Sequence, residues 1–401
     1  MNKQTVRDID VKGKRALVRV DYNVPIKNGE VGDTLRIQGS FETINYLLEQ
    51  GSSLVLMSHL GEPKGKVDPA LSLEPVAAKA AELLGKPIAF YHDCIGDEVD
   101  EAVKALQPGQ IMMLENVRFH PEELDNDHAF AEKLASYGDI YVNDSFAVDH
   151  RDQVSVSGIA AIIPGVAGFL VEKEVNYIKG ALDHPNRPLV AVIGGAKVSS
   201  KIEVLENLIP KVDVLMIGGA MANTFYLAAD LPVGKSLVEP DFVAEAKRLV
   251  TLAKTENCEL ILPGDVVVSN DIDAPKDVRT IKVAEIKPDQ IIVDAAPAFG
   301  PEITPAVHEF LDFDNKCTVI WNGPIGVTEV PEFALGSRAL ADAIIALPGV
   351  ISIIGGGDTA AFIDDAGLHD KFTWVSTGGG ASLELMSGKT LPGIAALLDK
   401  K

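Results

Sequence analysis

The stretch from residue 189 to residue 209 reads LVAVIGGAKVSSKIEVLENLI and contains the patterns of a strand, a glycine turn and a helix in direct succession. Leu189–Ile193 is an uninterrupted apolar run rich in Val and Ile, which is typical of a strand buried on both faces of a parallel sheet. Gly194 and Gly195 end this run. The following residues predict a helix, because apolar side chains recur at spacings of four, three and four on one helical face: Val198, Ile202, Leu205 and Ile209.

Two lysines of this stretch suggest a binding site for phosphate groups. Lys197 and Lys201 are four residues apart, so the predicted helix would present both on one face in its first turns. A helix N-terminus offers free N–H groups and a partial positive charge, and glycines allow a ligand to approach the backbone closely. The stretch fits a polyphosphate site, and it fits equally well a plain strand–helix turn with two solvated lysines.

The composition indicates a globular protein with two domains. A chain of 401 residues exceeds the usual size of a single core, and 47% of its residues are hydrophobic. The N-terminal residues lack the apolar core of a secretory signal, and no apolar stretch is long enough to span a bilayer. Cys94, Cys258 and Cys317 are too far apart for a disulfide framework or a zinc site. We therefore expect a cytoplasmic protein.

The formal net charge of −22 excludes some classes of partner. It argues against binding to nucleic acid or to an anionic membrane surface. It also opposes anionic substrates, so a site for them requires a local group of cationic side chains.

Strand and helix patterns alternate along the first half of the chain, which predicts a mostly parallel sheet. Polar residues follow the apolar strands, and ligands of open α/β sheets bind beyond the carboxyl ends of the strands. We expect four cationic or potentially cationic side chains to meet there: Arg36, His59, Arg118 and Arg151. Such a group suits a small molecule with phosphate and carboxylate groups, because arginine binds both in bidentate fashion. Each arginine alone is more often part of a surface ion pair, but their recurrence after successive strands favours a binding site.

Glycine-containing loops follow five further apolar strands in the second half. Several such loops at one end of a sheet form a floor of backbone N–H groups, which suits a polyphosphate. Asp358 lies in the loop 355–359 and is a candidate Mg²⁺ ligand; it also fits the N-cap of the next helix, and both roles are compatible. The Walker A motif and the dinucleotide fingerprint are absent.

Seven segments, in this order, resemble the phosphoglycerate kinase family: VDYNVP, SHLG, ENVRFHPEE, GGAKVSSKI, WNGPIGV, GGGDTAA and STGGGASLELMSGKTLPG. The resemblance covers essentially the whole chain. It implies an α/β fold of two doubly wound, mostly parallel-sheet domains that are joined by a helix and have a cleft between them. Residues 1–170 would form the phosphoglycerate-binding domain, and residues 171–387 the connector helix and the nucleotide-binding domain. The tail, residues 388–401, would pack on the N-terminal domain.

The resemblance also implies a reaction. Phosphoglycerate kinases transfer a phosphoryl group reversibly between 1,3-bisphosphoglycerate and ADP in glycolysis, which gives 3-phosphoglycerate and ATP. We expect Mg²⁺ as the cofactor, ATP or ADP as the co-substrate, and a monomer whose partners are small molecules only. The transfer would be in line, without a covalent enzyme intermediate, and would require closure of the two domains.

Three groups of site residues follow from the resemblance, position by position. The positions that match the phosphoglycerate site are Asp21, Asn23, Arg36, His59, Arg118 and Arg151. The positions that match the nucleotide site, with Glu329 at the ribose and Asp358 at Mg²⁺, are Gly195, Ala196, Lys197, Lys201, Gly219, Asn322, Pro324, Glu329, Gly355, Gly356, Gly357, Asp358 and Thr359. The groups expected to act on the transferring phosphoryl group are Arg36, Lys197, Gly357, Gly378 and Gly379.

The sequence departs from the family pattern at a few positions. Glu62 stands where the family's SHLGRP motif has an arginine, so a carboxylate replaces an expected cation near the phosphoglycerate site. Residues 146–151 read FAVDHR in place of FGTAHR, which leaves the geometry before Arg151 open. These departures are the basis of one alternative, a catalytically inactive relative that acts as a binding or scaffold protein. A nicotinamide-dependent oxidoreductase is another alternative, and the missing dinucleotide fingerprint weighs against it.

Overall fold

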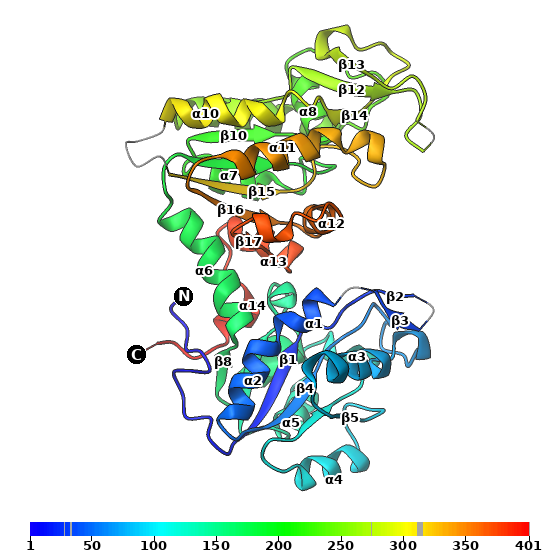
Figure 1. Cartoon of the computed structure of the whole chain (residues 1–401), viewed down its shortest axis with the longest axis vertical. Coiled ribbons are helices and arrows are strands. Elements are labelled where there is room, and N and C mark those ends of the chain that lie inside the picture. Colours follow the sequence, from blue (N-terminus) through cyan, green and yellow to red (C-terminus); the bar gives the residue numbers. More distant parts are fainter. Residues whose placement is uncertain (28, 33, 274, 311–315, 401) are drawn as a thin grey trace. The chain divides into compact units, whose positions relative to one another are not determined.

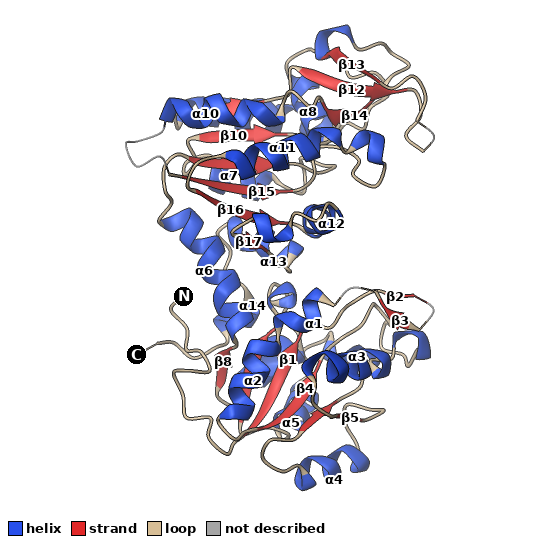
Figure 2. Ribbon diagram, in the orientation of Figure 1, coloured by secondary structure: helices blue, strands red, loops and turns tan. Residues whose placement is uncertain are grey.

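The computed structural model of the chain describes residues 1–27, 29–32, 34–273, 275–310 and 316–400 (Figure 1). The chain divides into two compact units. Unit 1 is Met1–Asn176 with Thr390–Lys401, and unit 2 is Tyr177–Lys389. Each unit contains a six-stranded parallel sheet with helices on both faces (Figure 2), so the predicted α/β class with two mostly parallel sheets is confirmed.

The sheet of unit 1 has the strand order β5-β6-β4-β1-β7-β8. Its strands are β1 Arg15–Val20, β4 Ser53–Met57, β5 Ile88–Phe90, β6 Ile111–Met113, β7 Ile140–Asp144 and β8 Gly165–Ala167. The helices of this unit are α1 Leu35–Gly39, α2 Phe41–Glu49, α3 Glu74–Leu84, α4 Asp97–Ala105, α5 His128–Ala135 and α14 Pro392–Ala395. A short antiparallel pair, β2 Ile26–Lys27 and β3 Glu30–Val31, follows β1. Because β1 pairs with β4 on one side and β7 on the other, the loops that leave these three strands begin next to one another.

The sheet of unit 2 has the strand order β11-β10-β9-β15-β16-β17. Its strands are β9 Leu189–Ile193, β10 Val214–Ile217, β11 Glu259–Ile261, β15 Cys317–Asn322, β16 Val350–Gly355 and β17 Trp374–Val375. The helices are α7 Ile202–Leu208, α8 Met221–Ala228, α9 Val243–Thr255, α10 Ile303–Phe310, α11 Leu335–Ala346, α12 Gly357–Asp365 and α13 Gly379–Met386. The helix α6 Phe169–Asp183 begins in unit 1 and ends in unit 2.

The helix expected after β9 begins later than the sequence predicts. It was expected to include Lys197 and Lys201 in its first turns, but α7 starts at Ile202, and Lys201 is its N-cap. The two lysines therefore do not share a helical face. The physical reason is a contact outside the stretch: Ser199 donates from its backbone N and its Oγ to the carboxylate of Glu239, at 3.0 and 2.6 Å, which holds the intervening residues as turns.

Seven of the described strands are absent from the sequence-based prediction: β2, β3, β5, β8, β12, β13 and β14. A second, three-stranded antiparallel sheet in unit 2 has the order β13-β12-β14 and consists of β12 Asp265–Ser269, β13 Arg279–Lys282 and β14 Ile291–Ala295. The segment Gly165–Ala167 forms β8, an edge strand of the sheet of unit 1. A strand of three residues is too short for a periodic pattern to reveal it.

The C-terminal segment packs on unit 1. Lys3 Nζ donates to the carbonyl oxygens of Ala395 and Leu397, at 2.9 and 2.7 Å. The backbone N of Gly393 donates to Asp149 O at 2.9 Å.

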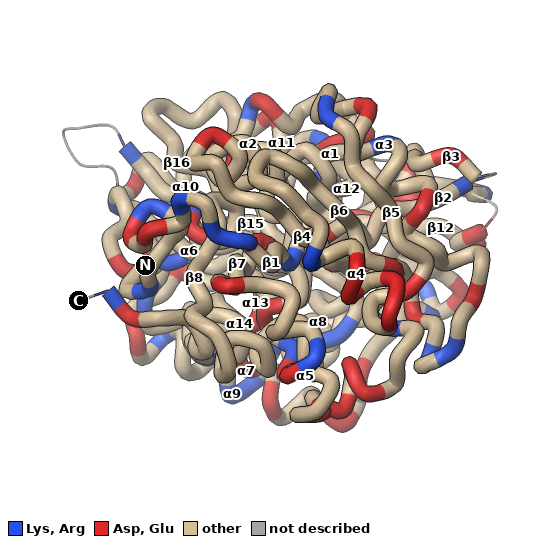
Figure 3. The backbone as a smooth tube through the Cα atoms, turned by 90° about the horizontal axis from the view of Figure 1, so that it is seen from below, with Lys and Arg blue, Asp and Glu red and all other residues tan. Residues whose placement is uncertain are grey.

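Acidic and basic segments are interspersed along the chain, with acidic residues prominent on α4 (Figure 3). Among the described residues, we find no helix with the length and apolarity that crossing a membrane requires.

Candidate active site

The loop after β1 carries an ion pair at the carboxyl end of the sheet of unit 1. Arg36, in the short helix α1, donates from Nη1 to Asp21 Oδ2 at 2.9 Å. Asp21 follows β1 directly and is 2% exposed, so its carboxylate holds the guanidinium at the strand end. Asn23 is nearby, because Arg36 Nη1 also reaches Asn23 O at 3.5 Å, and Asn23 Oδ1 accepts from Gly61 N at 2.9 Å.

The loop after β4 is connected in turn to two more arginines. Arg118 lies in a single helical turn after β6, Val117–Phe119, and donates from Nη1 to Gly61 O at 2.9 Å and to Glu62 Oε1 at 2.8 Å. Arg151 Nη1 lies 3.4 Å from the same oxygen of Glu62. The structure thus brings the sequence-predicted Asp21, Asn23, Arg36, Arg118 and Arg151 into one connected group, which we call the cationic cluster.

His59 lies at this cluster but is not a cation. Its side chain is buried, and Nδ1 lies 3.1 Å from Nη2 of Arg19. Burial, followed by the positive charges of Arg19 and Arg118, lowers the pKa of His59 well below 6.5. The expectation of a potentially cationic His59 is therefore wrong near neutral pH, and its neutral ring is a hydrogen-bonding group instead.

Arg19 is a cationic side chain whose place in the cluster the sequence did not indicate. It lies inside β1 and is fully buried, where it donates to Ser155 Oγ at 2.9 Å and to Val20 O at 2.6 Å. Burial lowers the pKa of Arg19 below its usual value. The sequence does not distinguish a buried arginine within an apolar strand from an exposed arginine at a sheet edge.

The glycine loops of unit 2 pack tightly on one another. Gly195 N donates to Pro324 O at 3.0 Å, and Gly219 N donates to Ile325 O at 3.2 Å, so the loops after β9, β10 and β15 are joined. Gly219 has a φ of +68°, and a Cβ atom there would lie 2.7 Å from Gly195 N and 2.8 Å from Pro324 O. Only glycine fits this position without strain.

The loops after β15, β16 and β17 continue this arrangement. Thr359 Oγ1 accepts from Gly323 N at 2.8 Å. A Cβ atom on Gly355 would lie 2.9 Å from Asn322 Nδ2, and one on Gly379 would lie 2.7 Å from Gly357 N. The sequence-predicted Gly355, Gly356, Gly357, Gly378 and Gly379 therefore lie at the end of β16 and at the starts of α12 and α13, where Gly379 packs against Gly357.

Lys201 has a defined place among these loops, and Lys197 does not. Lys201 Nζ donates to Asn322 Oδ1 at 2.6 Å, and burial lowers the pKa of Lys201 to about 8, with Asp358 opposing that shift. The buried Asn322 Nδ2 has no hydrogen-bond partner among the described residues. Lys197 is exposed in the loop before α7 and does not line the pocket described next.

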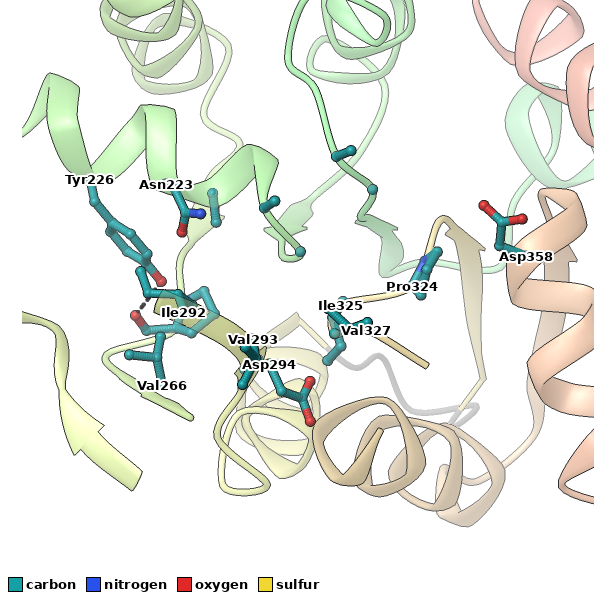
Figure 4. A pocket seen from close by; sticks show the side chains of 18 of the residues that line it. Asn223, Tyr226, Val266, Ile292, Val293, Asp294, Pro324, Ile325, Val327 and Asp358 are labelled. Carbon is teal, nitrogen blue, oxygen red and sulfur yellow. Dashed lines mark hydrogen bonds between the residues drawn. The ribbon is translucent and has the colours of Figure 1, made fainter. Parts of the chain in front are cut away.

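A pocket of about 270 Å³ lies beside the loops of unit 2 (Figure 4). Six sequence-predicted residues line it: Gly195, Ala196, Gly219, Pro324, Glu329 and Asp358. Figure 4 shows Tyr226 at one end and Asp358 at the other, with Pro324 between them. The apolar lining near Tyr226 includes Val266 and Ile292, so one end suits a flat apolar ring and the other a charged group.

Three polar residues of this pocket were missed: Asn223, Tyr226 and Asp294. Tyr226 Oη donates to Pro263 O at 2.8 Å. Asp294 accepts from Gly336 N at 2.6 Å through Oδ2, while its buried Oδ1 has no partner among the described residues. Burial raises the pKa of Asp294 to about 8. Only the position of Asp294 near the end of β14 could have pointed to it, and that strand was not predicted.

Asp358 fits a magnesium ligand. It lies in the first turn of α12 and lines the charged end of the pocket. The N-cap of α12 is Gly356, which corrects the alternative that Asp358 caps this helix. One carboxylate beside a phosphate site is the usual protein contribution to nucleotide-bound Mg²⁺.

Comparisons with known proteins agree with this geometry. A family model described as phosphoglycerate kinase matches residues 6–389. The chain is 50% identical over 408 residues to a phosphoglycerate kinase of Chloroflexus aurantiacus and 51% identical over 401 residues to one of Herpetosiphon aurantiacus, with both chains covered completely. Among solved structures, a phosphoglycerate kinase from Coxiella burnetii is similar, with a TM-score of 0.85, 38% identity and 98% of each chain covered. One from Pyrococcus horikoshii OT3 has a TM-score of 0.84, 29% identity and the same coverage.

Proposed function

Because the chain belongs to the phosphoglycerate kinase family, we propose that it transfers a phosphoryl group reversibly between 1,3-bisphosphoglycerate and ADP, which gives 3-phosphoglycerate and ATP. The observation that carries this proposal is the cationic cluster, in which Arg36, Arg118 and Arg151 gather in a chain of net charge −22. Such a cluster suits a small anion with phosphate and carboxylate groups. The inactive alternative has no observation in its favour.

The pocket of unit 2 is the proposed nucleotide site. Its apolar end, near Tyr226, would take the base, and Glu329 would contact the ribose. The phosphates would lie along the glycine loops, where backbone N–H groups and Lys201 can bind them. Mg²⁺, held through Asp358, would neutralise charge on these phosphates.

We propose a direct, in-line transfer. The transferring phosphoryl group carries charge on its oxygens, and the protein can stabilise it by positioning and by positive charge without a covalent intermediate. Arg36 would act from the phosphoglycerate side, held in place by Asp21. Lys197 and the N–H groups of Gly357, Gly378 and Gly379 would act from the nucleotide side.

The two proposed sites belong to different units, so the reaction requires a state in which they meet. We place the movement at α6, because this helix belongs to both units. Such closure would also exclude water, which protects the acyl phosphate from hydrolysis.

We further infer a monomer in the cytoplasm that does not bind nucleic acid. One chain supplies every residue of both proposed sites, so a second copy is not needed. Cys94, Cys258 and Cys317 are unpaired, as is usual in a reducing compartment. The net charge of −22 opposes binding to nucleic acid. Light scattering with size-exclusion chromatography tests the oligomeric state.

A coupled assay tests the proposed reaction. The protein is supplied with 3-phosphoglycerate, MgATP, glyceraldehyde-3-phosphate dehydrogenase and NADH, and the loss of NADH absorbance is followed. The proposal predicts NADH loss that requires both 3-phosphoglycerate and MgATP. Tight binding of MgADP without turnover would favour the inactive relative instead.

A further inference from the structure

The carboxylate of Glu62 occupies the cationic cluster in place of an external anion. Its Oε1 lies 2.8 Å from Arg118 Nη1 and 3.4 Å from Arg151 Nη1, so one carboxylate oxygen is shared by two guanidinium groups. Glu62 is 59% exposed, whereas Arg118 is 2% exposed. The carboxylate of Glu62 therefore lies on the solvent side of the ion pair, and it can turn away from the arginines into solvent.

Arg118 has hydrogen-bonding capacity that Glu62 does not satisfy. Its Nε and Nη2 atoms are buried and have no partner among the described residues. Buried charged donors without partners are costly, so these atoms favour a ligand with several acceptor oxygens. Burial and the nearby Arg151 guanidinium lower the pKa of Arg118 to about 10, and the carboxylate of Glu62 opposes that shift.

We propose that Glu62 is an internal competitor for the anionic substrate: it closes the Arg118–Arg151 pair in the free protein, and the phosphorylated substrate displaces it. This inference rests on the proposed function, because it places the phosphoglycerate at the cationic cluster. The substrate must bind the buried N–H donors of Arg118. The carboxylate of Glu62, which is exposed and bonded to Arg118, is the group that can move to let it bind. Every anion that binds must first break the ion pairs of Glu62 with Arg118 and Arg151, and this cost lowers its affinity.

The same competition makes Glu62 a determinant of specificity. A ligand with a single carboxylate only replaces one carboxylate by another at the two arginines. A phosphate group brings more negative charge and more acceptor oxygens, so it gains more when Glu62 leaves. The site would therefore discriminate against non-phosphorylated hydroxy acids more strongly with Glu62 than without it.

The test is the variant Glu62→Gln, which keeps the size of the side chain and removes its charge. We expect the KM for 3-phosphoglycerate to fall about fivefold, the upper end of the range measured for surface ion pairs, because one partner of the pair is buried. The KM for MgATP should not change, because the nucleotide pocket lies in unit 2. Inhibition by inorganic sulfate and by glycerate should both strengthen, and that by glycerate by the larger factor.

Glu122→Gln is the matched control, because Glu122 is an exposed glutamate of the same unit and its substitution changes the net charge equally. It should leave the KM for 3-phosphoglycerate unchanged. A KM for Glu62→Gln within twofold of the wild-type value would overturn the proposal. A raised KM would overturn it too, because Glu62 would then position the arginines for the substrate.

Calorimetric titration with 3-phosphoglycerate separates this inference from the proposed function. Tighter binding to Glu62→Gln than to the wild type supports the competitor even in a protein without turnover. Equal or weaker binding contradicts it even in a protein that is fully active. Thermal unfolding of both variants confirms that each is folded.

Discussion

Arg36 Nη1 lies 2.9 Å from Asp21 Oδ2, and this ion pair joins a side chain that is 29% exposed to one that is 2% exposed. Asp21 follows a central strand directly, whereas Arg36 lies in a helix of only five residues. The sheet fixes the position of the Asp21 carboxylate, and this carboxylate in turn orients the guanidinium of Arg36. An exposed face of Arg36 remains available to a ligand, which is what a group that stabilises a transferring phosphoryl group requires.

Arg36→Ala should lower kcat far more than it weakens nucleotide binding. Removal of one charged donor that acts in the transition state costs roughly 10²- to 10³-fold in kcat. The affinity for MgADP, measured by calorimetry, should stay within about twofold, because the nucleotide pocket lies in unit 2. Arg338→Ala, which removes a surface arginine paired with Asp342, is the control. Equal losses in kcat and in nucleotide affinity would argue against a transition-state role.

Asp21→Asn should act through Arg36. The variant keeps the shape of the side chain but releases the guanidinium, and we expect kcat/KM for 3-phosphoglycerate to fall about tenfold, less than in Arg36→Ala. The double variant should be no slower than Arg36→Ala alone. Additive losses in this cycle would show that Asp21 acts independently of Arg36.

Asp358→Asn should remove the effect of magnesium on nucleotide binding. Calorimetry on the wild type should give tighter ADP binding with Mg²⁺ than with EDTA, and kcat/KM for MgATP should fall roughly 10- to 100-fold in the variant. Asp365→Asn, at an exposed position of the same helix, is the control. A magnesium effect that persists in Asp358→Asn would place the metal on another residue.

Gly219→Ala should weaken nucleotide binding and destabilise unit 2. The new Cβ would lie 2.7 Å from Gly195 N at a φ of +68°, so the strain adds to a steric clash. We expect a loss of about tenfold or more in ADP affinity and a lower unfolding temperature. Gly264→Ala is the control, because a Cβ there meets no atom within 4 Å. Equal behaviour of the two variants would contradict the close packing of the loops.

Asp149→Asn should reduce the loss of stability as the pH rises from about 4 to about 8. Asp149 is fully buried, and burial raises the pKa of its carboxyl to about 8. A carboxyl whose folded pKa is raised stabilises the folded state most below its unfolded pKa, near 4, and that contribution is lost as the pH rises to about 8. One group contributes at most about 1.4 kcal/mol per pH unit over this window.

Urea unfolding at pH 5.5 and 8.5 measures this dependence. The free energy of unfolding of Asp149→Asn should fall less between the two values than that of the wild type. Asp125→Asn replaces an exposed aspartate by asparagine and is the control; the change in its free energy of unfolding between the two pH values should match that of the wild type. Parallel curves for all three proteins would contradict the raised pKa.

The sequence predicts the central strands well and the irregular segments poorly. β9 and β10 begin and end where their apolar runs do, because each run is buried throughout and followed by glycine. The start of α7 depends on the contact of Ser199 with Glu239, 40 residues away, which no local pattern contains. The three-stranded sheet of β12, β13 and β14 was missed because the antiparallel pairing is not local either.

The cationic cluster shows how far sequence reasoning reaches into the site. Parallel strands bring the residues after their carboxyl ends together, so the sequence alone is enough to group Arg36, Arg118 and Arg151. The protonation state of His59 could not be predicted from the sequence, because it depends on the burial of His59 and on the buried Arg19. The contacts of Glu62 could not be predicted either, because the sequence does not show which arginines share its carboxylate.

Isotope exchange between labelled ADP and unlabelled ATP tests the central claim most directly. The protein is incubated with MgATP and labelled ADP, with and without 3-phosphoglycerate, and label in ATP is counted. Direct transfer predicts exchange only when 3-phosphoglycerate is present, because the phosphoryl group then has an acceptor other than the protein. Exchange without 3-phosphoglycerate would reveal a covalent phosphoryl-enzyme, and no exchange in its presence would contradict the proposed kinase activity.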